Sequence, residues 1–367
     1  GIYTQVEQLN KTALKSHGLD SNGQLYKINS FEFYRYEDII KKEDDAGYDK
    51  TAFEKMLEIK GDSDHTKLID MLTDLNDYSI GIEDVLKEHF DEENIVYWMA
   101  FQILMGNVDT QNRNVYLYSP LNSDIWYFIA WDNDGCLMRP EYELRNFSDQ
   151  NSWEKGISNY WGNILFQRCL KSRSFREKLN DAILDLREYL NKDMLTSKIE
   201  SYKNVLKPYL YLMPDAEYEP LTSEQYDQIA ASLPDEIEKN YQLYLESLET
   251  PMPFYIGVPT IDGDKLKFNW DVSYDLDAED ITYSVEVARD YLFRDVIYQN
   301  TTLIVPEAEM DLPEAGQYFV RVRATNTSGK TQDAFDYYVT DEGKYYGMRC
   351  FYITEDSTVE EDDYEEG

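Results

Sequence analysis

Residues 94–135 constrain the fold of this chain more than any other stretch. Residues 94–105 are almost entirely apolar and stop at Gly106, which predicts a buried helix that ends at a glycine. Two short apolar segments rich in aromatic and β-branched residues follow, at 115–118 and 126–131, and the sequence between them is typical of a turn. A buried helix, a loop and a β-hairpin are therefore expected in that order.

Candidate metal ligands lie where this hairpin begins and ends. The loop before it carries Asp109 and Asn114 in a D-x4-N spacing, and Asp132 and Asp134 follow it. Because a hairpin brings its two ends together, Asn114 and Asp132 should be close in space. Metal-dependent phosphoryl transfer uses such a set: one carboxylate accepts the proton of the substrate hydroxyl, while Asn and Asp oxygens hold Mg²⁺ against the phosphates.

Two other interpretations of these residues stay open. Asp, Asn and Gly in loops commonly form turns and bind nothing. The sequence from Asp132 to Gly135 also resembles the start of an EF-hand loop, although the Glu required further on is not at the right offset, so a structural Ca²⁺ site is an alternative. Asp132 is the hardest to dismiss, because a carboxylate at the end of a buried strand is costly unless a cation meets it.

Charge and composition exclude several classes of function. The chain has 72 acidic and 35 basic residues, a formal charge of −37, which would repel a nucleic-acid backbone. Such a charge favours cationic partners, including basic peptides, although it also serves simply to keep a protein dispersed. No apolar run approaches the roughly 18 residues of a membrane span. Three cysteines and three histidines are scattered, so neither a disulfide framework nor a zinc site is predicted.

Around this central stretch the pattern predicts a mixed α and β domain. Strands are expected at 2–7 and 24–28, with a short helix at 6–15 between them. Helical periodicity then recurs in the second half of the domain, and the predicted helices are 82–90, 161–170, 174–190, 192–206 and 223–248.

The composition changes near residue 250 to alternating apolar and polar residues, as in the half-buried strands of a sandwich. Residues 312–318 have the spacing of a tyrosine corner that ends in Tyr318. With Trp270 before it and a V-R-V-R-A strand after it, the region resembles a fibronectin type III domain. The remaining residues form an acidic tail that we expect to be disordered.

The central motifs resemble a known family. The run G-N-x-D-x4-N-x-Y-L-Y, followed by W-x4-W-D-x-D, is similar to the spore coat protein H (CotH) family of atypical protein kinases. The first seven residues and the L-Y-K segment ending at Lys27 also resemble segments of that family. The family's domain normally begins earlier, with basic residues that grip phosphate, so we expect this chain to lack an N-terminal portion and to be inactive if that portion is required. Lys27 is the nearest candidate for a phosphate-binding lysine, although a strand lysine is commonly a solvated surface group.

The resemblance implies an ATP- and Mg²⁺-dependent kinase acting on Ser or Thr of a basic, serine-rich protein, with Mn²⁺ or Ca²⁺ as other possible ions. By position, Asp109 corresponds to the catalytic carboxylate, Asp132 to the metal-binding one and Asn114 to a second metal ligand, with Asp134 as a further partner of the metal. A bacterial protein outside the cell or at its surface is expected, with cellulosome or cell-surface partners, and a spore coat is the weaker alternative.

These observations predict an α+β fold. It comprises a kinase-like CotH domain, mostly its helical lobe, over residues 1–250, an all-β fibronectin III sandwich over 251–353 and an acidic tail over 354–367. The functional alternative is a non-catalytic extracellular binding or scaffold module, in which the Asp cluster holds a structural cation.

Overall fold

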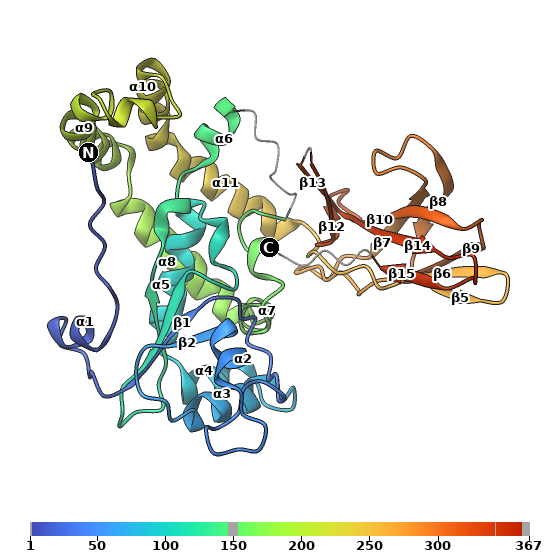
Figure 1. Ribbon diagram of the computed structural model, residues 1–367, viewed down its shortest axis with the longest axis horizontal. Helices are drawn as coiled ribbons and strands as arrows, with labels where there is room; N and C mark the ends of the chain where they lie inside the picture. Colours follow the sequence, from blue (N-terminus) through green and yellow to red (C-terminus); the bar gives the residue numbers. More distant parts are fainter. Residues whose placement is uncertain (1, 146–152, 342, 362–367) are drawn as a thin grey trace. The chain divides into compact units, whose positions relative to one another are not determined.

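The computed structural model describes residues 2–145, 153–341 and 343–361, and the chain forms two compact units (Figure 1). The first unit comprises Gly1–Asn146 and Tyr160–Leu243. The second comprises Phe147–Asn159 and Tyr244–Gly367.

The first unit combines helices with one small sheet. Its strands are β1 (Gln24–Ile28), β2 (Leu57–Ile59), β3 (Val115–Ser119) and β4 (Tyr127–Ala130). Its helices are α1 (Lys11–Ser16), α2 (Lys50–Met56), α3 (Thr66–Asn76), α4 (Ile82–His89), α5 (Glu92–Met105), α6 (Arg139–Arg145), α7 (Ile164–Lys171), α8 (Arg173–Tyr189), α9 (Lys192–Leu210), α10 (Ser223–Ser232) and α11 (Glu236–Glu249), the last of which continues into the second unit. Short 3₁₀ turns are η1 (Val108–Thr110), η2 (Asn133–Gly135), η3 (Ser158–Tyr160), η4 (Asp215–Glu217) and η5 (Leu233–Asp235).

The sheet of the first unit is antiparallel in the order β2-β1-β3-β4, and β3 and β4 form the predicted hairpin. Helix α5 packs against β4 and against α8 (Figure 1). Trp98 of α5 stacks on Phe128 of β4 at 5.1 Å and on Phe166 of α7 at 5.6 Å. The side chain of Asn94 exchanges two hydrogen bonds with the backbone of Phe128, at 2.7 and 3.1 Å. The hairpin is thus held firmly on a buried helix.

The end of α5 confirms the predicted glycine stop. Gly106 lies in the left-handed region at φ 62°, where a side chain is strained. A Cβ at this position would also lie 2.7 Å from the side-chain nitrogen of Asn240 on α11. Two independent constraints therefore require glycine where the chain leaves α5 for the loop at 107–114.

Several predicted elements differ from the observed ones. Residues 2–9 lie outside any helix or strand, so the strand predicted at 2–7 is wrong; Gly1 is outside the described residues. The first helix starts only at Lys11, because the side chain of Asn10 accepts hydrogen bonds from two backbone amides of the first turn. The helix predicted at 223–248 is two helices, α10 and α11, separated at η5, where Pro234 lacks the amide hydrogen of a continuous helix.

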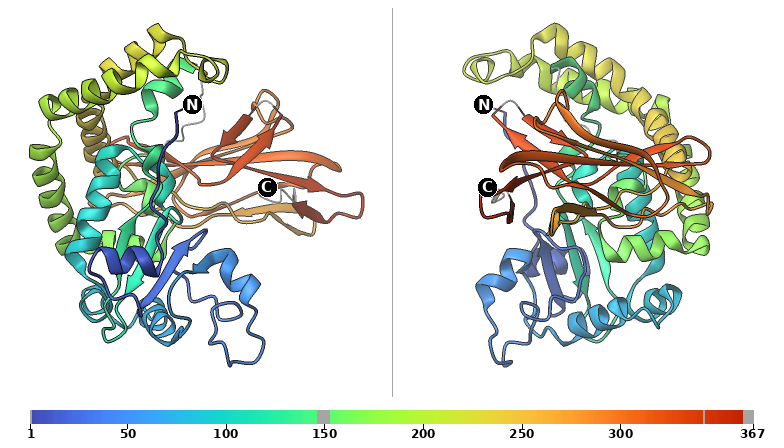
Figure 2. Two further views of the ribbon diagram at one scale, coloured as in Figure 1. Left: turned by 60° about the vertical axis from the view of Figure 1, so that its left-hand side comes forward. Right: turned by 90° about the vertical axis from the view of Figure 1, so that its right-hand side faces the viewer.

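The α9–α10 hairpin and the strand region of β1 and β2 lie at opposite ends of the first unit (Figure 2). None of the helices in the described ranges has both the length and the apolar character that a membrane span requires.

The second unit is built from strands. These are β5 (Thr260–Asp262), β6 (Lys265–Asn269), β7 (Ile281–Ala288), β8 (Val296–Leu303), β9 (Glu307–Asp311), β10 (Gly316–Asn326), β11 (Thr331–Asp333), β12 (Tyr337–Thr340), β13 (Gly343–Tyr346), β14 (Met348–Ile353) and β15 (Val359–Glu361). One sheet has the order β15-β14-β10-β7-β8 with β11 paired to β10, a second is β5-β6-β9, and β12 pairs with β13.

The core of the second unit is formed by the alternating residues that the sequence pattern predicted. Phe268 of β6 belongs to the same buried cluster as Val285 of β7 and Val320 of β10. The hydroxyl of Tyr318 donates a 2.7 Å hydrogen bond to the carbonyl of Glu314, which is the contact expected of a tyrosine corner. These features form a β-sandwich, and its assignment as a fibronectin III domain stays a prediction.

The acidic tail is partly ordered, contrary to expectation. Strand β15 pairs antiparallel with β14, with Ile353 opposite Val359 and Phe351 opposite Glu361. Arg349 forms an ion pair with Glu361 and so offsets part of the tail's negative charge. Residues 362–367, which fall within the predicted tail, lie outside the described residues.

Replacing Tyr318 with Phe should lower the free energy of unfolding of the second unit by about 1 kcal/mol, because it removes one buried hydrogen bond. Urea denaturation followed by near-ultraviolet circular dichroism would measure this. Tyr298→Phe is the matched control, since Tyr298 packs against the same core while its hydroxyl makes no hydrogen bond within the described residues. Equal stability of the two variants would contradict the corner.

Candidate active site at the open end of the β3–β4 hairpin

Asp109 lies in η1, directly after α5, and both of its carboxylate oxygens are engaged. Arg113 Nε lies 2.9 Å from Oδ1, and Asn114 Nδ2 donates to Oδ2 at 2.8 Å. The side chain of Asp109 is 46% exposed, so a substrate hydroxyl can still approach it. The D-x4-N spacing thus brings Asp109 and Asn114 into direct contact. Arg113, which the sequence analysis did not single out, completes the arrangement.

The register of the hairpin places the two halves of the site side by side. Val115 pairs with Ala130, so Asn114 lies one residue outside the last pair on β3 and faces the end of β4. Asn114 at φ 59° and Asp132 at φ 55° both adopt the left-handed conformation. Such strained non-glycine positions concentrate at functional sites. The register therefore places Asn114 and Asp132 at the same end of the hairpin, and a direct contact between their side chains stays a prediction.

The environment of Asp132 differs from the expectation. We predicted a carboxylate at the end of a buried strand, but β4 is only half buried and the side chain of Asp132 is exposed. The pKa of Asp132 is nevertheless raised, first by partial desolvation and then by the neighbouring carboxylate of Asp134, with a smaller contribution from Asp109, while Lys27 opposes the shift. A bound cation would relieve the repulsion between Asp132 and Asp134.

The donor atoms fit a hard divalent cation. In the described ranges, no group of three or more His, Cys, Asp or Glu side chains is arranged to hold a metal ion. The available set is instead mixed, with carboxylates from Asp132 and Asp134 and the amide oxygen of Asn114, and Mg²⁺ accepts oxygen ligands of both kinds. Burial raises the pKa of the nearby Cys136 thiol to about 12, so this sulfur stays protonated and does not compete as a ligand.

The loop at 107–114 is braced by residues that are distant in the sequence. The side chain of Asn112 donates to Glu32 at 2.6 Å, and the backbone amide of Phe31 donates to the carbonyl of Asn112 at 2.8 Å. The side chain of Asn163 donates to the carbonyl of Gln111 at 2.9 Å. The sequence analysis missed Glu32 and Asn163, because no fixed spacing connects them to the D-x4-N loop.

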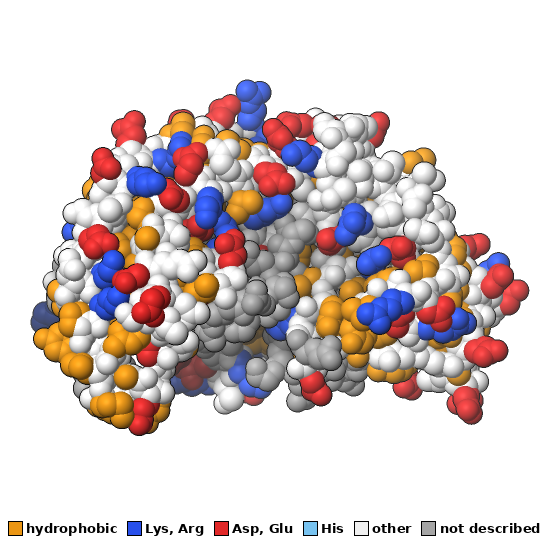
Figure 3. All heavy atoms as spheres, turned by 90° about the horizontal axis from the view of Figure 1, so that it is seen from above, with side chains coloured by type: hydrophobic (Ala, Val, Ile, Leu, Met, Phe, Trp, Pro, Cys, Tyr) orange, Lys and Arg blue, Asp and Glu red, His pale blue; other side chains and the backbone are white. Residues whose placement is uncertain are grey.

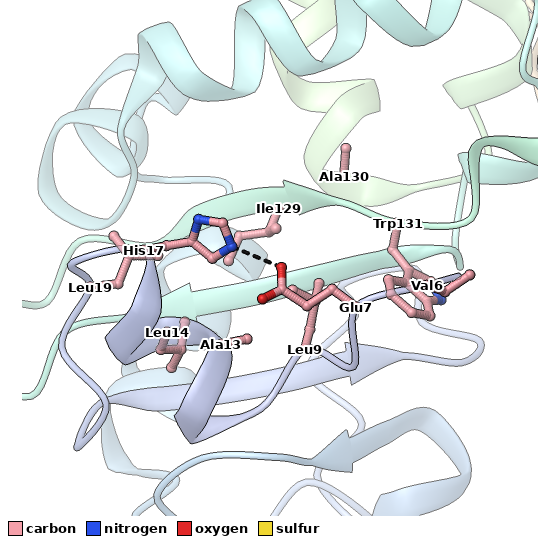
Figure 4. Close-up of a pocket in the computed structure, with 10 residues that line it drawn as sticks. All are labelled: Val6, Glu7, Leu9, Ala13, Leu14, His17, Leu19, Ile129, Ala130 and Trp131. Carbon is pink, nitrogen blue, oxygen red and sulfur yellow. Dashed lines mark hydrogen bonds and ion pairs between the residues drawn. The ribbon is translucent and has the colours of Figure 1, made fainter. Parts of the chain in front are cut away.

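A cavity of about 480 Å³ lies beside the end of β4 (Figure 4). One side is formed by β4 and the other by the segment before α1 and by α1 itself. The side chains of His17 and Glu7 meet at 2.8 Å along its lining. The residues that line it are mostly apolar: Val6, Glu7, Leu9, Ala13, Leu14, His17, Leu19, Ile129, Ala130 and Trp131.

The cavity adjoins the proposed metal ligands through Trp131, the residue before Asp132. The rings of Trp131 and Tyr116 are in edge contact at 5.3 Å on the same face of the sheet. Lys27 on β1 pairs with Tyr116 on β3, and the charge of Lys27 partly offsets the rise in the pKa of Asp132. An apolar cavity, a lysine and a carboxylate pair therefore lie on one continuous surface of the first unit.

A family model described as CotH kinase protein matches residues 1–244, two thirds of the chain. The chain belongs to this family. All four predicted site residues, Asp109, Asn114, Asp132 and Asp134, lie within the match. A comparison with curated proteins found no match. The family assignment made from the central motifs is thereby confirmed, and membership in a kinase family suggests an atypical kinase activity.

Replacing Asp134 with Asn in this CotH-family protein should lower the pKa of Asp132 toward its ordinary value, because it removes a like charge. A carboxyl whose pKa is higher in the folded than in the unfolded state destabilises the folded protein as pH rises from the unfolded-state pKa through the folded-state pKa. With the Asp132 pKa lowered, the Asp134→Asn variant should therefore lose less stability over this pH range than the wild type does. A carboxyl ¹³C NMR titration measures the pKa directly. Asp124→Asn, in the turn at the other end of the hairpin, is the control and should leave the pKa of Asp132 unchanged. An unchanged Asp132 pKa in Asp134→Asn would contradict the interaction between the two carboxylates.

Proposed function

We propose that this protein is an ATP-dependent protein kinase that transfers a phosphoryl group to Ser or Thr hydroxyls of a partner protein. The observation that carries the proposal is the contact of Asp109 with Asn114 at the start of β3, next to the Asp132–Asp134 pair after β4. Family membership supports phosphoryl transfer as the reaction. The arrangement at the end of the hairpin supports Asp109 as the proton acceptor and the Asp132–Asp134 pair as metal ligands.

In this mechanism Asp109 orients the acceptor hydroxyl and accepts its proton. Its half-exposed carboxylate supports access by a protein substrate, while Arg113 and Asn114 hold the carboxylate in one orientation. Asp132, Asn114 and Asp134 are the residues that would hold Mg²⁺. When bound, the ion supplies charge neutralisation at the phosphates, and Mn²⁺ or Ca²⁺ suits the same oxygen atoms.

The cavity beside Trp131 supports a position for the nucleotide. Its mostly apolar lining suits a flat base and includes Trp131, the residue before Asp132 (Figure 4). In this proposal Lys27 contacts the phosphates, because it lies close enough to the carboxylate pair to influence the pKa of Asp132. In this proposal the base lies in the cavity beside Trp131, the phosphates lie at Lys27 and the metal lies at Asp132.

The proposed substrate is a basic, serine-rich protein outside a bacterial cell or at its surface. The net charge of −37 supports a cationic partner. On the face drawn in Figure 3 acidic side chains are interspersed with lysines and arginines, which favours recognition by local contacts as well as by overall charge. The β-sandwich supports an extracellular location, since such modules space domains in secreted proteins, and cellulosome or cell-surface partners belong to the same proposal.

Asp132→Asn should reduce phosphoryl transfer by at least about 100-fold without unfolding the protein, since one neutral oxygen replaces a charged metal ligand at an exposed position. Intact-mass spectrometry after incubation with Mg-ATP and a basic serine-rich peptide would detect the transferred group. Asp124→Asn makes the same change at the other end of the hairpin and should transfer normally. Undiminished transfer by Asp132→Asn would refute the role of Asp132.

The second candidate function is a non-catalytic binding or scaffold module with a structural cation. The mutual repulsion of Asp132 and Asp134 favours it, because a bound Ca²⁺ would relieve that repulsion without any nucleotide. On this hypothesis Ca²⁺ raises the melting temperature, Mg-ATP does not, and no transfer occurs. A melting-temperature increase with Mg-ATP, accompanied by transfer, decides for the kinase.

A further inference from the structure

Gln102 is a polar residue inside a helix made largely of apolar ones. It lies on α5 among buried neighbours, and its side chain is fully buried. A buried amide costs free energy unless its hydrogen-bonding atoms find partners. Both ends of the Gln102 amide are paired, and neither partner belongs to the surrounding apolar core.

The two ends of this amide bind the two loops of the site. Gln102 Oε1 accepts a 3.0 Å hydrogen bond from Asn107 Nδ2, at the start of the loop that holds Asp109. Gln102 Nε2 donates a 3.1 Å hydrogen bond to Asn133 Oδ1, and Asn133 lies between Asp132 and Asp134 in the sequence. One side chain therefore connects the loop of the catalytic carboxylate with the loop of the metal-binding carboxylates.

These hydrogen bonds form a chain with a single direction. The backbone amide of Asp109 donates to Asn107 Oδ1 at 3.4 Å, so Asn107 presents its NH₂ group to Gln102. Gln102 then presents its own NH₂ group to Asn133. Each amide is thereby held in one of its two possible orientations, which are otherwise hard to distinguish.

The same two loops approach each other closely at Gly135. A Cβ added at Gly135 would lie 2.7 Å from Asn107 Oδ1, so the turn after Asp132 packs closely against Asn107. The backbone amide of Asn107 also donates to the carbonyl of Gln102 at 3.0 Å. The missing side chain at Gly135 thus lets the two loops lie close together at this point, and the hydrogen bonds through Gln102 oppose their separation.

We propose that Gln102 is a positioning residue that sets the separation between Asp109 and the Asp132–Asp134 pair. It acts through Asn107 and Asn133 and touches neither the metal nor the substrate. The proposal rests on the function proposed above. Residues that orient metal ligands in this way typically contribute 10- to 100-fold to metal affinity, because a misplaced ligand must be reorganised before it can bind.

The test measures the Mn²⁺ affinity of the full chain, with Mn²⁺ as a spectroscopic substitute for Mg²⁺. The electron paramagnetic resonance signal of the free ion reports how much Mn²⁺ remains unbound. Gln102→Met keeps the length of the side chain and removes both amide hydrogen bonds. It should weaken Mn²⁺ binding by about 10- to 100-fold. Phosphoryl transfer at saturating ATP should require correspondingly more Mg²⁺, which a merely destabilised but folded protein would not show.

Asn94→Leu is the matched control. Asn94 lies on the same helix, and its side-chain amide also makes two hydrogen bonds, but both go to the backbone of Phe128. The control variant should melt at a lower temperature and bind Mn²⁺ like the wild type. If it weakens Mn²⁺ binding as much as Gln102→Met does, the effect is general destabilisation and the proposal is overturned.

Asn133→Ala provides a second route if Gln102→Met does not fold. Asn133 is exposed, so its loss leaves the core intact while breaking the link to Gln102. Asn133→Ala should also weaken Mn²⁺ binding. The variant that carries both substitutions should bind Mn²⁺ no more weakly than whichever single variant binds it less tightly, because both changes break the same link. Wild-type affinity in both single variants would overturn the role of Gln102 while leaving the kinase proposal intact. A wild-type protein that binds no Mn²⁺ and transfers no phosphate would instead overturn the proposed function, and this inference with it.

Discussion

The candidate site depends on the register of one β-hairpin. Because Val115 pairs with Ala130, Asn114 and Asp132, eighteen residues apart in the sequence, both lie just beyond the same end of the hairpin. A shift of one residue in this pairing would turn each side chain to the other face of the sheet. The register is fixed because one face of the hairpin is buried on α5, where Trp98 stacks on Phe128.

That rigid support explains how the protein tolerates a cluster of like charges. Partial desolvation raises the pKa of Asp132, the neighbouring carboxylate of Asp134 raises it further, and Asp109 adds to the effect. Flexible loops would relax by moving the carboxylates apart. Here Gln102 holds the turn of Asp132 and Asp134 through Asn133, while Glu32 and Asn163 hold the loop of Asp109 through Asn112 and Gln111. A site of this kind gains most from a cation, since the ligands are already in place.

Much of the architecture was predictable from local pattern. The apolar run before Gly106, the hairpin and the alternating strands of the second unit were all predicted and are observed, because their periodicity reflects burial on one face or on both. Several local predictions were wrong, among them the strand expected at 2–7, where no strand forms. Strand β15 was missed because acidic residues obscured its pairing with β14, and α10 and α11 were merged because helical periodicity continued across Pro234. The strand before Asp132 was expected to be buried, but β4 lies at the edge of its sheet and is only half buried.

The sequence by itself determined which chemistry the site can offer. The D-x4-N loop and the paired Asp residues predict oxygen ligands and a proton acceptor, and the same motifs indicated the CotH family, which the family model confirms. Only the tertiary structure decided which side chains hold these groups in place, because Glu32, Gln102 and Asn163 act through folded contacts that no sequence spacing encodes. A local motif shows which residue types a site contains. The distance between two loops depends instead on buried side chains, such as Gln102, that contact both loops.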